Sequence, residues 1–160
     1  MEWSHLFNMQ KQLDSYIESN HQLDSIDLFD KKVLALLVEV GELANETRCF
    51  KFWSKKAPSE NKVILEEYVD GLHFILSLGL DKNLTFNSAK MEGSFNITDH
   101  FNNVFKEIIA FKSEPSKEKY NKLFNTYIAL GSKLGFDEKS VQAAYFEKNK
   151  VNHERQDKGY

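Results

Sequence analysis

Two pairs of acidic residues interrupt the most apolar stretches of this chain. Glu39 and Glu42 lie in LALLVEVGEL, and Glu67 and Asp70 lie in LEEYVDGLHF. A spacing of three places both members of a pair on one face of a helix, about one turn apart. If the two helices pack side by side, four carboxylates converge, and burying that much like charge is too costly unless a cation lies between them.

The chemistry of these acids favours one kind of cation. Mg²⁺ is a hard ion that prefers oxygen ligands and commonly takes phosphates as its remaining partners. In the alternative interpretation, the acids are solvated charges on amphipathic helices, which is where helix charges usually lie. Leu34, Leu37, Val38 and Leu43 leave little room for a solvated face around the first pair. The residue pattern by itself leaves both interpretations open.

The rest of the sequence is dominated by helical periodicity. The chain has seven glycines and two prolines, and no alternating apolar pattern persists, so we predict an all-α fold. Gly41 and Gly71 each weaken a predicted helix by about 1 kcal/mol relative to Ala, and we expect the close approach of a neighbouring helix or a ligand to account for them. Asp27 is the expected N-cap of the second helix, and Gly79 the C-cap of the third. The expected helices cover residues 3–17, 28–52, 59–78 and 98–112, a segment from Pro115 to between Gly131 and Gly135, and a last segment that begins at Asp137.

The composition is that of a globular protein about the size of one domain. The chain has 160 residues, of which 41% are hydrophobic and 28% charged, and we expect a single domain over 1–160. The net charge of −3 gives no sign of a nucleic-acid-binding surface. The single cysteine, Cys49, excludes an internal disulfide and fits a reducing compartment. We see neither a secretory leader nor an apolar run near the roughly 20 residues that span a bilayer, so we expect a cytoplasmic protein without a membrane partner.

Five stretches of the chain, in this order, resemble the motifs of the dimeric dUTPase family, bacterial and phage type. This family is a branch of the all-α NTP pyrophosphatase superfamily, which includes MazG-like enzymes. A single Glu-x-x-Glu is a weak signal, whereas five motifs in order are specific. The region between Leu80 and Val141 matches no motif. The matching stretches are MQKQLD at 9–14, LLVEVGELANE at 36–46, FKFWS at 50–54, LEEYVDGLHF at 65–74 and YFEKNKVNHERQDKGY at 145–160.

The resemblance implies a helical bundle with a four-helix catalytic core whose acids face inward to hold Mg²⁺. Either Glu39 or Glu42 would be the catalytic base that takes the proton of the attacking water, and neither is preferred. Glu46 is a further candidate ligand, and Glu66 is a weaker one because its spacing to Asp70 is four. The implied metal ligands are Glu39, Glu42, Glu67 and Asp70.

The C-terminal segment 145–160 is the expected phosphate-binding part of the chain. As a helix, it would present most of four polar residues on one side. Arg155 can grip phosphate oxygens with its planar fork, and Lys148 supplies a compact charge. By resemblance, Tyr145 and Tyr160 contact the sugar or the phosphates. Without the other motifs, the segment would be interpreted as a basic tail facing solvent. The four polar residues are Lys148, Asn149, Asn152 and Arg155.

Selection of a base requires an aromatic surface and a polar group that reads one edge of the base. By resemblance, Phe74 stacks on uracil and Gln10 hydrogen-bonds its edge, with help from Asn152. Trp53 and His73 would line the pocket. Core packing is the alternative role for Phe74 and Trp53, and a hydrogen-bonded interior position is the alternative for His73.

The resemblance therefore implies a dUTP diphosphatase, a Mg²⁺-dependent hydrolase of nucleotide metabolism. It would convert dUTP, and also dUDP, to dUMP and so limit uracil in DNA. It would be a homodimer, for which we expect an interface on the Phe-rich fourth and fifth helices. One alternative is a related NTP pyrophosphatase that acts on dCTP or a modified nucleotide. Another is a repressor-binding module derived from such an enzyme, because phage-type members also bind repressors of mobile genetic islands.

Overall fold

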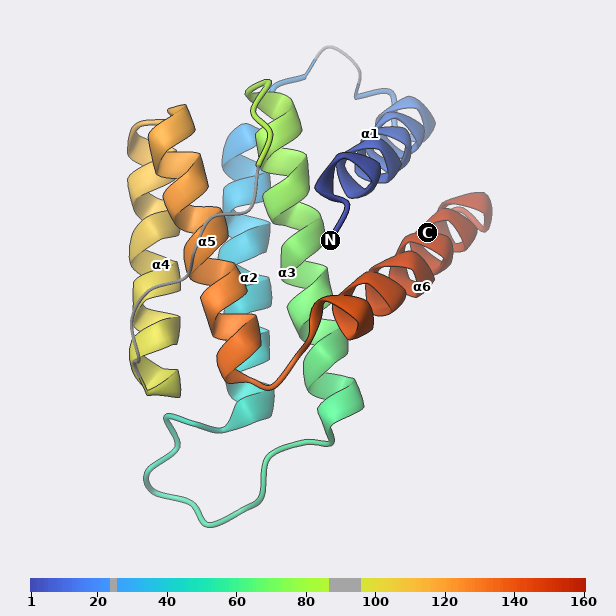
Figure 1. The fold of residues 1–160 in the computed structure, drawn as a ribbon. Coiled ribbons are helices and arrows are strands. Elements are labelled where there is room, and N and C mark those ends of the chain that lie inside the picture. Colours follow the sequence, from blue (N-terminus) through green and yellow to red (C-terminus); the bar gives the residue numbers. More distant parts are fainter. Residues whose placement is uncertain (24–25, 87–95) are drawn as a thin grey trace.

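The computed structural model describes residues 1–23, 26–86 and 96–160, and these residues form six helices and no strand (Figure 1). The all-α prediction is confirmed. Residues 87–95, in the stretch between the predicted helices 59–78 and 98–112, fall outside the described residues. The helices are α1 (Trp3–Asn20), α2 (Phe29–Thr47), α3 (Asn61–Asp81), α4 (Ile97–Ser113), α5 (Lys117–Lys133) and α6 (Glu138–Asp157).

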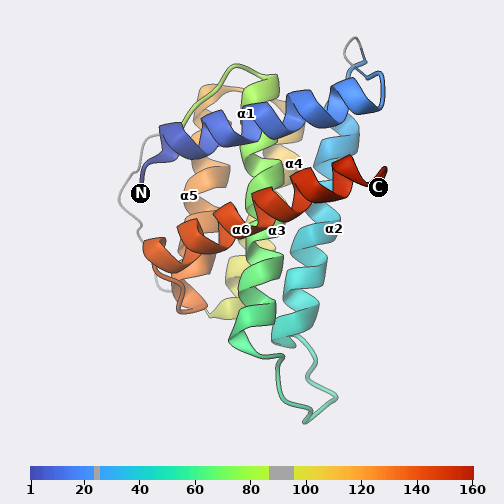
Figure 2. The ribbon, with the colours of Figure 1, turned by 90° about the vertical axis from the view of Figure 1, so that its right-hand side faces the viewer.

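Helix α3 lies at the centre of the arrangement. The helices α2, α3, α4 and α5 stand side by side along one direction, and α1 and α6 cross in front of α3 (Figures 1 and 2). α3 contacts α1, α2, α5 and α6. Its second half, GLHFILSLG, is buried at nearly every position. A helix that is apolar almost all round must be covered on several sides, which explains why four helices surround this one.

Glycines and tyrosines interlock α3 with α5. A Cβ atom at Gly71 would overlap the hydroxyl of Tyr127, and one at Gly131 would overlap the hydroxyl of Tyr68. The two tyrosines stack with ring centroids 4.5 Å apart, and each hydroxyl donates a hydrogen bond to the backbone carbonyl of the other residue. The close approach predicted for Gly71 is confirmed, whereas a Cβ at Gly41 would meet nothing within 4 Å.

The third interlocking glycine corrects a predicted helix end. Gly79 does not cap α3, which continues to Asp81. It lies buried against the hydroxyl of Tyr120, which donates a hydrogen bond of 2.8 Å to the carbonyl of Ile75. The pattern suggested a cap because a glycine near the end of an apolar run commonly ends a helix, but here the tyrosine of a neighbouring helix requires the missing side chain.

Helix α2 is shorter at its C-terminal end than predicted. It ends at Thr47 and not near Phe52, because Arg48 adopts a left-handed conformation with φ of 58°. The Arg48 side chain then donates hydrogen bonds to the Ser54 hydroxyl at 2.8 Å and to the Lys56 carbonyl at 3.1 Å, which tie down the following segment. At the other end, α2 begins at Phe29 with Leu28 at the N-cap position, so the predicted cap Asp27 lies one residue too early. Its side chain still accepts a hydrogen bond from the Phe29 backbone N–H at 3.0 Å.

The C-terminal segment is helical and not a frayed tail. α6 begins after the predicted Asp137, whose side chain accepts a hydrogen bond from the Ser140 backbone N–H at 2.7 Å. Near its end, α6 is joined to the end of α1 by the pairs Tyr16–Asp157 and His21–Gln156. Across the described part of the chain, no helix combines the length and the apolar character needed to cross a membrane.

The interlock predicts a coupling between Gly71 and Tyr127. Gly71→Ala should lower the free energy of unfolding by about 1–3 kcal/mol, because the added methyl overpacks a buried contact. In a Tyr127→Phe background the overlapping hydroxyl is gone, so the same change should cost less. Urea unfolding of the four proteins measures the difference, and equal costs in the two backgrounds would contradict the interlock.

Candidate active site

A cleft of about 380 Å³ lies where α1, α2, α3 and α6 meet. This volume is within the range of small-ligand pockets, roughly 300 to 1,000 Å³. α3 supplies the face Asp70, His73, Phe74 and Ser77, a helical spacing that points all four residues to one side. Of the residues predicted from sequence, the cleft is lined by Gln10, Glu39, Asp70, His73, Phe74, Lys148, Asn152, Arg155 and Tyr160.

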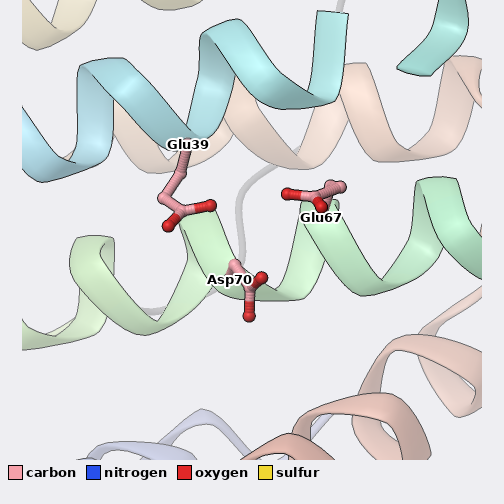
Figure 3. Close-up of side chains that lie close together, drawn as sticks. All are labelled: Glu39, Glu67 and Asp70. Carbon is pink, nitrogen blue, oxygen red and sulfur yellow. The ribbon is translucent and has the colours of Figure 1, made fainter. Parts of the chain in front are cut away.

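Three of the four predicted metal ligands come together between α2 and α3. Figure 3 shows Glu39 reaching from α2 toward Glu67 and Asp70 on α3. One carboxylate oxygen from each residue lies within 4.8 Å of the others. The Oε2 atoms of Glu39 and Glu67 are buried and have no hydrogen-bond partner among the described residues. This set of oxygen atoms fits a hard divalent cation.

The cluster is electrostatically strained without a cation. Burial, followed by the charges of Asp70 and Glu42, raises the pKa of Glu39 from 4.5 to about 8. Burial and the charge of Asp70 likewise raise the pKa of Glu67 to about 7. Burial also raises the pKa of Asp70, although Lys148 opposes this shift. A raised pKa means that the surroundings disfavour the ionised carboxylate. A bound cation would stabilise that ionised form.

The remaining acids of the two motifs have other surroundings. Glu42 is exposed, and its charge helps to raise the pKa of Glu39. Glu46 accepts a hydrogen bond from the Ser59 hydroxyl in the segment between α2 and α3. Glu66 is exposed and pairs with Lys148 at 3.0 Å. All three charges act on the carboxylate cluster: Glu42 helps raise the pKa values of Glu39 and Glu67, Glu46 that of Glu67, and Glu66 that of Asp70.

Helix α6 brings cations to the acidic wall. Lys148 pairs with Asp70 at 3.1 Å as well as with Glu66, and its side chain is only 10% exposed. Burial lowers the pKa of Lys148, but the two carboxylates outweigh this effect and raise it. Further along α6, the Arg155 guanidinium lies 5.2 Å from the centroid of the Tyr160 ring. The predicted phosphate-binding residues thus include two cations at the cleft.

A buried polar network forms the opposite wall of the cleft. Gln10 Oε1 accepts a hydrogen bond from the Tyr145 hydroxyl at 2.8 Å and lies 2.6 Å from His73 Nδ1. Gln10 Nε2 donates to Asp14 at 2.9 Å, and the Ser77 hydroxyl donates to Asp14 at 2.7 Å. Burial and the charge of Lys148 lower the pKa of His73 to about 3, so this histidine is neutral.

Three residues predicted to contact substrate lie elsewhere. Trp53 is 64% exposed, in the segment that projects beyond the ends of α2 and α3 (Figure 1). Tyr145 and Asn149 are buried on α6, and neither lines the cleft. Tyr145 stacks on His73 with ring centroids 4.2 Å apart, so it supports the wall of the cleft from behind.

Sequence reasoning missed several polar residues of the cleft. Asp14 and Ser77 belong to the buried network, and Glu18 and Lys32 line the cleft beyond them. Lys32 pairs with Asp81 at 2.8 Å and with Glu18 at 3.8 Å. The available signal was the helical spacing, since Ser77 continues the face of Asp70 and His73 by one further turn.

Comparison with known proteins agrees with this geometry. A family model described as dUTPase matches residues 2–160. The match includes all four helices around the cleft. No curated protein matches the chain.

The raised pKa values predict how stability depends on pH when no divalent cation is present. Glu39 and Glu67 are ordinarily ionised above 4.5 but titrate at about 8 and about 7 in the fold. Between pH 4.5 and about 8 the folded state therefore binds more protons than the unfolded state. The free energy of unfolding should then fall as pH rises from 5 to 8. Urea unfolding in EDTA at several pH values measures this slope.

Glu39→Gln should make the free energy of unfolding less dependent on pH, because the glutamine side chain does not ionise. Glu60→Gln makes the same change at an exposed position before α3 and should leave the slope as it is. If Glu39→Gln left the pH dependence of the unfolding free energy unchanged, this result would contradict a raised pKa at Glu39.

Proposed function

Because the chain belongs to the dUTPase family, it is a dUTP diphosphatase, and we propose that it uses Mg²⁺ to hydrolyse dUTP to dUMP and pyrophosphate. The observation that carries the Mg²⁺ proposal is the cluster of Glu39, Glu67 and Asp70, which places a carboxylate oxygen of each residue within 4.8 Å of the others. One oxygen of Glu39 and one of Glu67 are buried without a hydrogen-bond partner among the described residues. The proposal extends to dUDP as a second substrate and to a role in limiting uracil in DNA. A cytoplasmic location is also proposed.

The cluster fits the needs of the reaction. When bound, Mg²⁺ would neutralise phosphate charge and lower the pKa of a bound water. Glu39, Glu67 and Asp70 would hold it, and the exposed Glu42 is the fourth proposed ligand. Without a metal at the site, these acids would repel a triphosphate.

Glu39 is our candidate for the group that accepts the proton of the attacking water. It lines the cleft, whereas Glu42 is exposed and does not. A general base must lie within hydrogen-bond reach of the proton that it accepts. Glu42 would then act through Glu39, since its charge already favours proton uptake by that carboxyl.

The segment 145–160 is proposed to bind the phosphates. Lys148 and Arg155 line the cleft beside the acids, and Asn152 lies on the same wall. Tyr160 supports Arg155 by a cation–π contact. Asn149 and Tyr145 are buried behind this wall, so they are proposed to hold it in position.

The base is proposed to lie against Phe74. This residue is partly exposed at the cleft, one turn after Asp70, so a nucleotide whose phosphates meet the acids would bring its base near this ring. Gln10 and His73 line the same part of the cleft. Stacking alone accepts any base, so the neighbouring polar atoms must select it.

A homodimer is proposed, with an interface on α2. The phenylalanines Phe101, Phe111 and Phe124 of α4 and α5 are buried in the core of the chain, which leaves them unavailable for an interface. Leu34 and Val38 are 62% and 50% exposed, one turn apart on α2. The exposed Trp53 would be free to contact a second copy.

The enzymatic proposal predicts loss of activity without loss of fold. Glu67→Gln should lower kcat/KM for dUTP about 100-fold or more, because it removes a charged ligand from the proposed metal site. Glu118→Gln makes the same change on the exposed first turn of α5 and should keep activity. Pyrophosphate release in Mg²⁺ measures both, and full activity of Glu67→Gln would refute the metal site.

The same assay across dUTP, dCTP, dTTP and UTP tests the substrate. We expect dUTP to give the highest kcat/KM. A preference for dCTP or for no nucleotide would favour the related NTP pyrophosphatase.

The proposed interface predicts a change of oligomeric state. Val38→Glu should shift the mass in solution toward that of one chain, because a charge would enter an apolar contact. Ser132→Glu adds the same charge at an exposed polar position of α5 and should leave the mass unchanged. Light scattering on a sizing column measures both variants, and an unshifted Val38→Glu protein would rule out this face.

A further inference from the structure

We infer that Asp14 is a positioning residue for base selection: it orients Gln10 so that Nε2 of His73 is left as a bare hydrogen-bond acceptor at the cleft. A base that offers an N–H to this atom, as the imide of uracil does, would be accepted. Cytosine would be refused, because its N3 is itself an acceptor. The inference rests on the proposed binding of a deoxyuridine nucleotide and adds a reason for its selection.

Asp14 fixes the orientation of the Gln10 amide. Gln10 is 3% exposed, so its amide atoms depend on protein partners. Its Nε2 lies 2.9 Å from Oδ1 of Asp14, and the Ser77 hydroxyl donates to Oδ2 of the same carboxylate at 2.7 Å. Burial raises the pKa of Asp14, whereas the Ser77 hydroxyl, the charge of Lys32 and the Gln10 amide oppose this shift by stabilising the ionised form. An ionised carboxylate can only accept hydrogen bonds. Asp14 therefore holds the NH₂ group of Gln10 on its own side and turns Oε1 to the opposite side.

The carbonyl oxygen of Gln10 in turn fixes the tautomer of His73. Gln10 Oε1 faces the Tyr145 hydroxyl at 2.8 Å and His73 Nδ1 at 2.6 Å. A carbonyl oxygen can only accept, so the proton of the imidazole must lie on Nδ1. The ring carries a single proton, because it is neutral. Its Nε2 is consequently an acceptor.

The Nε2 atom of His73 lacks a hydrogen-bond donor. His73 Nε2 is buried and has no hydrogen-bond partner among the described residues, although the residue lines the cleft. A buried polar atom without a partner is destabilising. A donor on a ligand in the cleft would meet this need. Phe74, the proposed stacking surface, follows His73 in sequence and lines the same cleft.

Uracil and cytosine differ at the atom that such an acceptor reads. Uracil carries a hydrogen on N3, and cytosine carries a lone pair there. A site built to pair with an N–H rejects an analogue that lacks it more strongly than a site that reads shape alone. Thymine shares the imide of uracil, so this device separates dUTP from dCTP and does not separate dUTP from dTTP.

Asp14→Asn tests the chain of hydrogen bonds with an isosteric change. The asparagine amide can accept from Gln10 or donate to it, so the Gln10 amide is no longer restricted to one orientation. In the reversed orientation Gln10 donates to Nδ1, and the proton of His73 moves to Nε2. Asp30→Asn makes the same substitution at an exposed position of α2 and serves as the control.

Two measurements are needed. The ¹⁵N resonances of the His73 ring in the nucleotide-free protein report the tautomer without any assay of activity. We expect the proton on Nδ1 in the unmodified protein and in Asp30→Asn, and a mixture in Asp14→Asn. The ratio of kcat/KM for dUTP to that for dCTP should fall about tenfold or more in Asp14→Asn and stay unchanged in Asp30→Asn.

The outcomes separate this inference from the proposed function. A proton on Nε2 in the unmodified protein overturns the inference even if dUTP is the preferred substrate. A loss of preference in Asp14→Asn without a change of tautomer also overturns it. If the tautomer is as expected but dUTP and dCTP are hydrolysed equally by the unmodified protein, the positioning by Asp14 holds, and the base selection and the proposed substrate preference both fail.

Discussion

The close packing of α3 against α5 is the constraint on which the rest of the molecule depends. At three glycines of these helices, the missing side chain leaves space for a tyrosine hydroxyl from the facing helix. The stacked pair Tyr68 and Tyr127 also donates hydrogen bonds to the backbones of both helices. Because one side of α3 is held in this way, its other side can serve as the floor of a cleft. Asp70, His73 and Ser77 lie on that side.

The cleft presents two contrasting surfaces along this helix. At one end Glu39, Glu67 and Asp70 lie close together, and burial, followed by the charges of neighbouring acids, raises their pKa values. Further along, Gln10 and its partners form a network of oriented hydrogen bonds. In the proposed function the acidic end would meet phosphates through a metal, and the hydrogen-bonded end would meet the edge of the base. One helix thus aligns two chemistries.

The helices and the acidic pairs were predictable because both depend on local spacing. Glu39, Glu67 and Asp70 were identified from a three-residue repeat in apolar sequence, and their convergence needed only that α2 and α3 be neighbours. Gly79 was predicted wrongly because its role depends on Tyr120, a residue of another helix. The surroundings of Trp53 were also beyond local spacing, since Arg48 ends α2 early and leaves the tryptophan exposed.

The sequence by itself determined the helical class, the two acidic pairs and the resemblance to the dimeric dUTPases, because periodicity and short motifs are properties of neighbouring residues. Only the tertiary structure decided which acids meet, and it brought Glu39 into the cleft while leaving Glu42 exposed. It also decided the orientation of Gln10, which depends on partners from three helices. Hydrogen bonds between distant segments have direction, and direction exists only once the helices have packed.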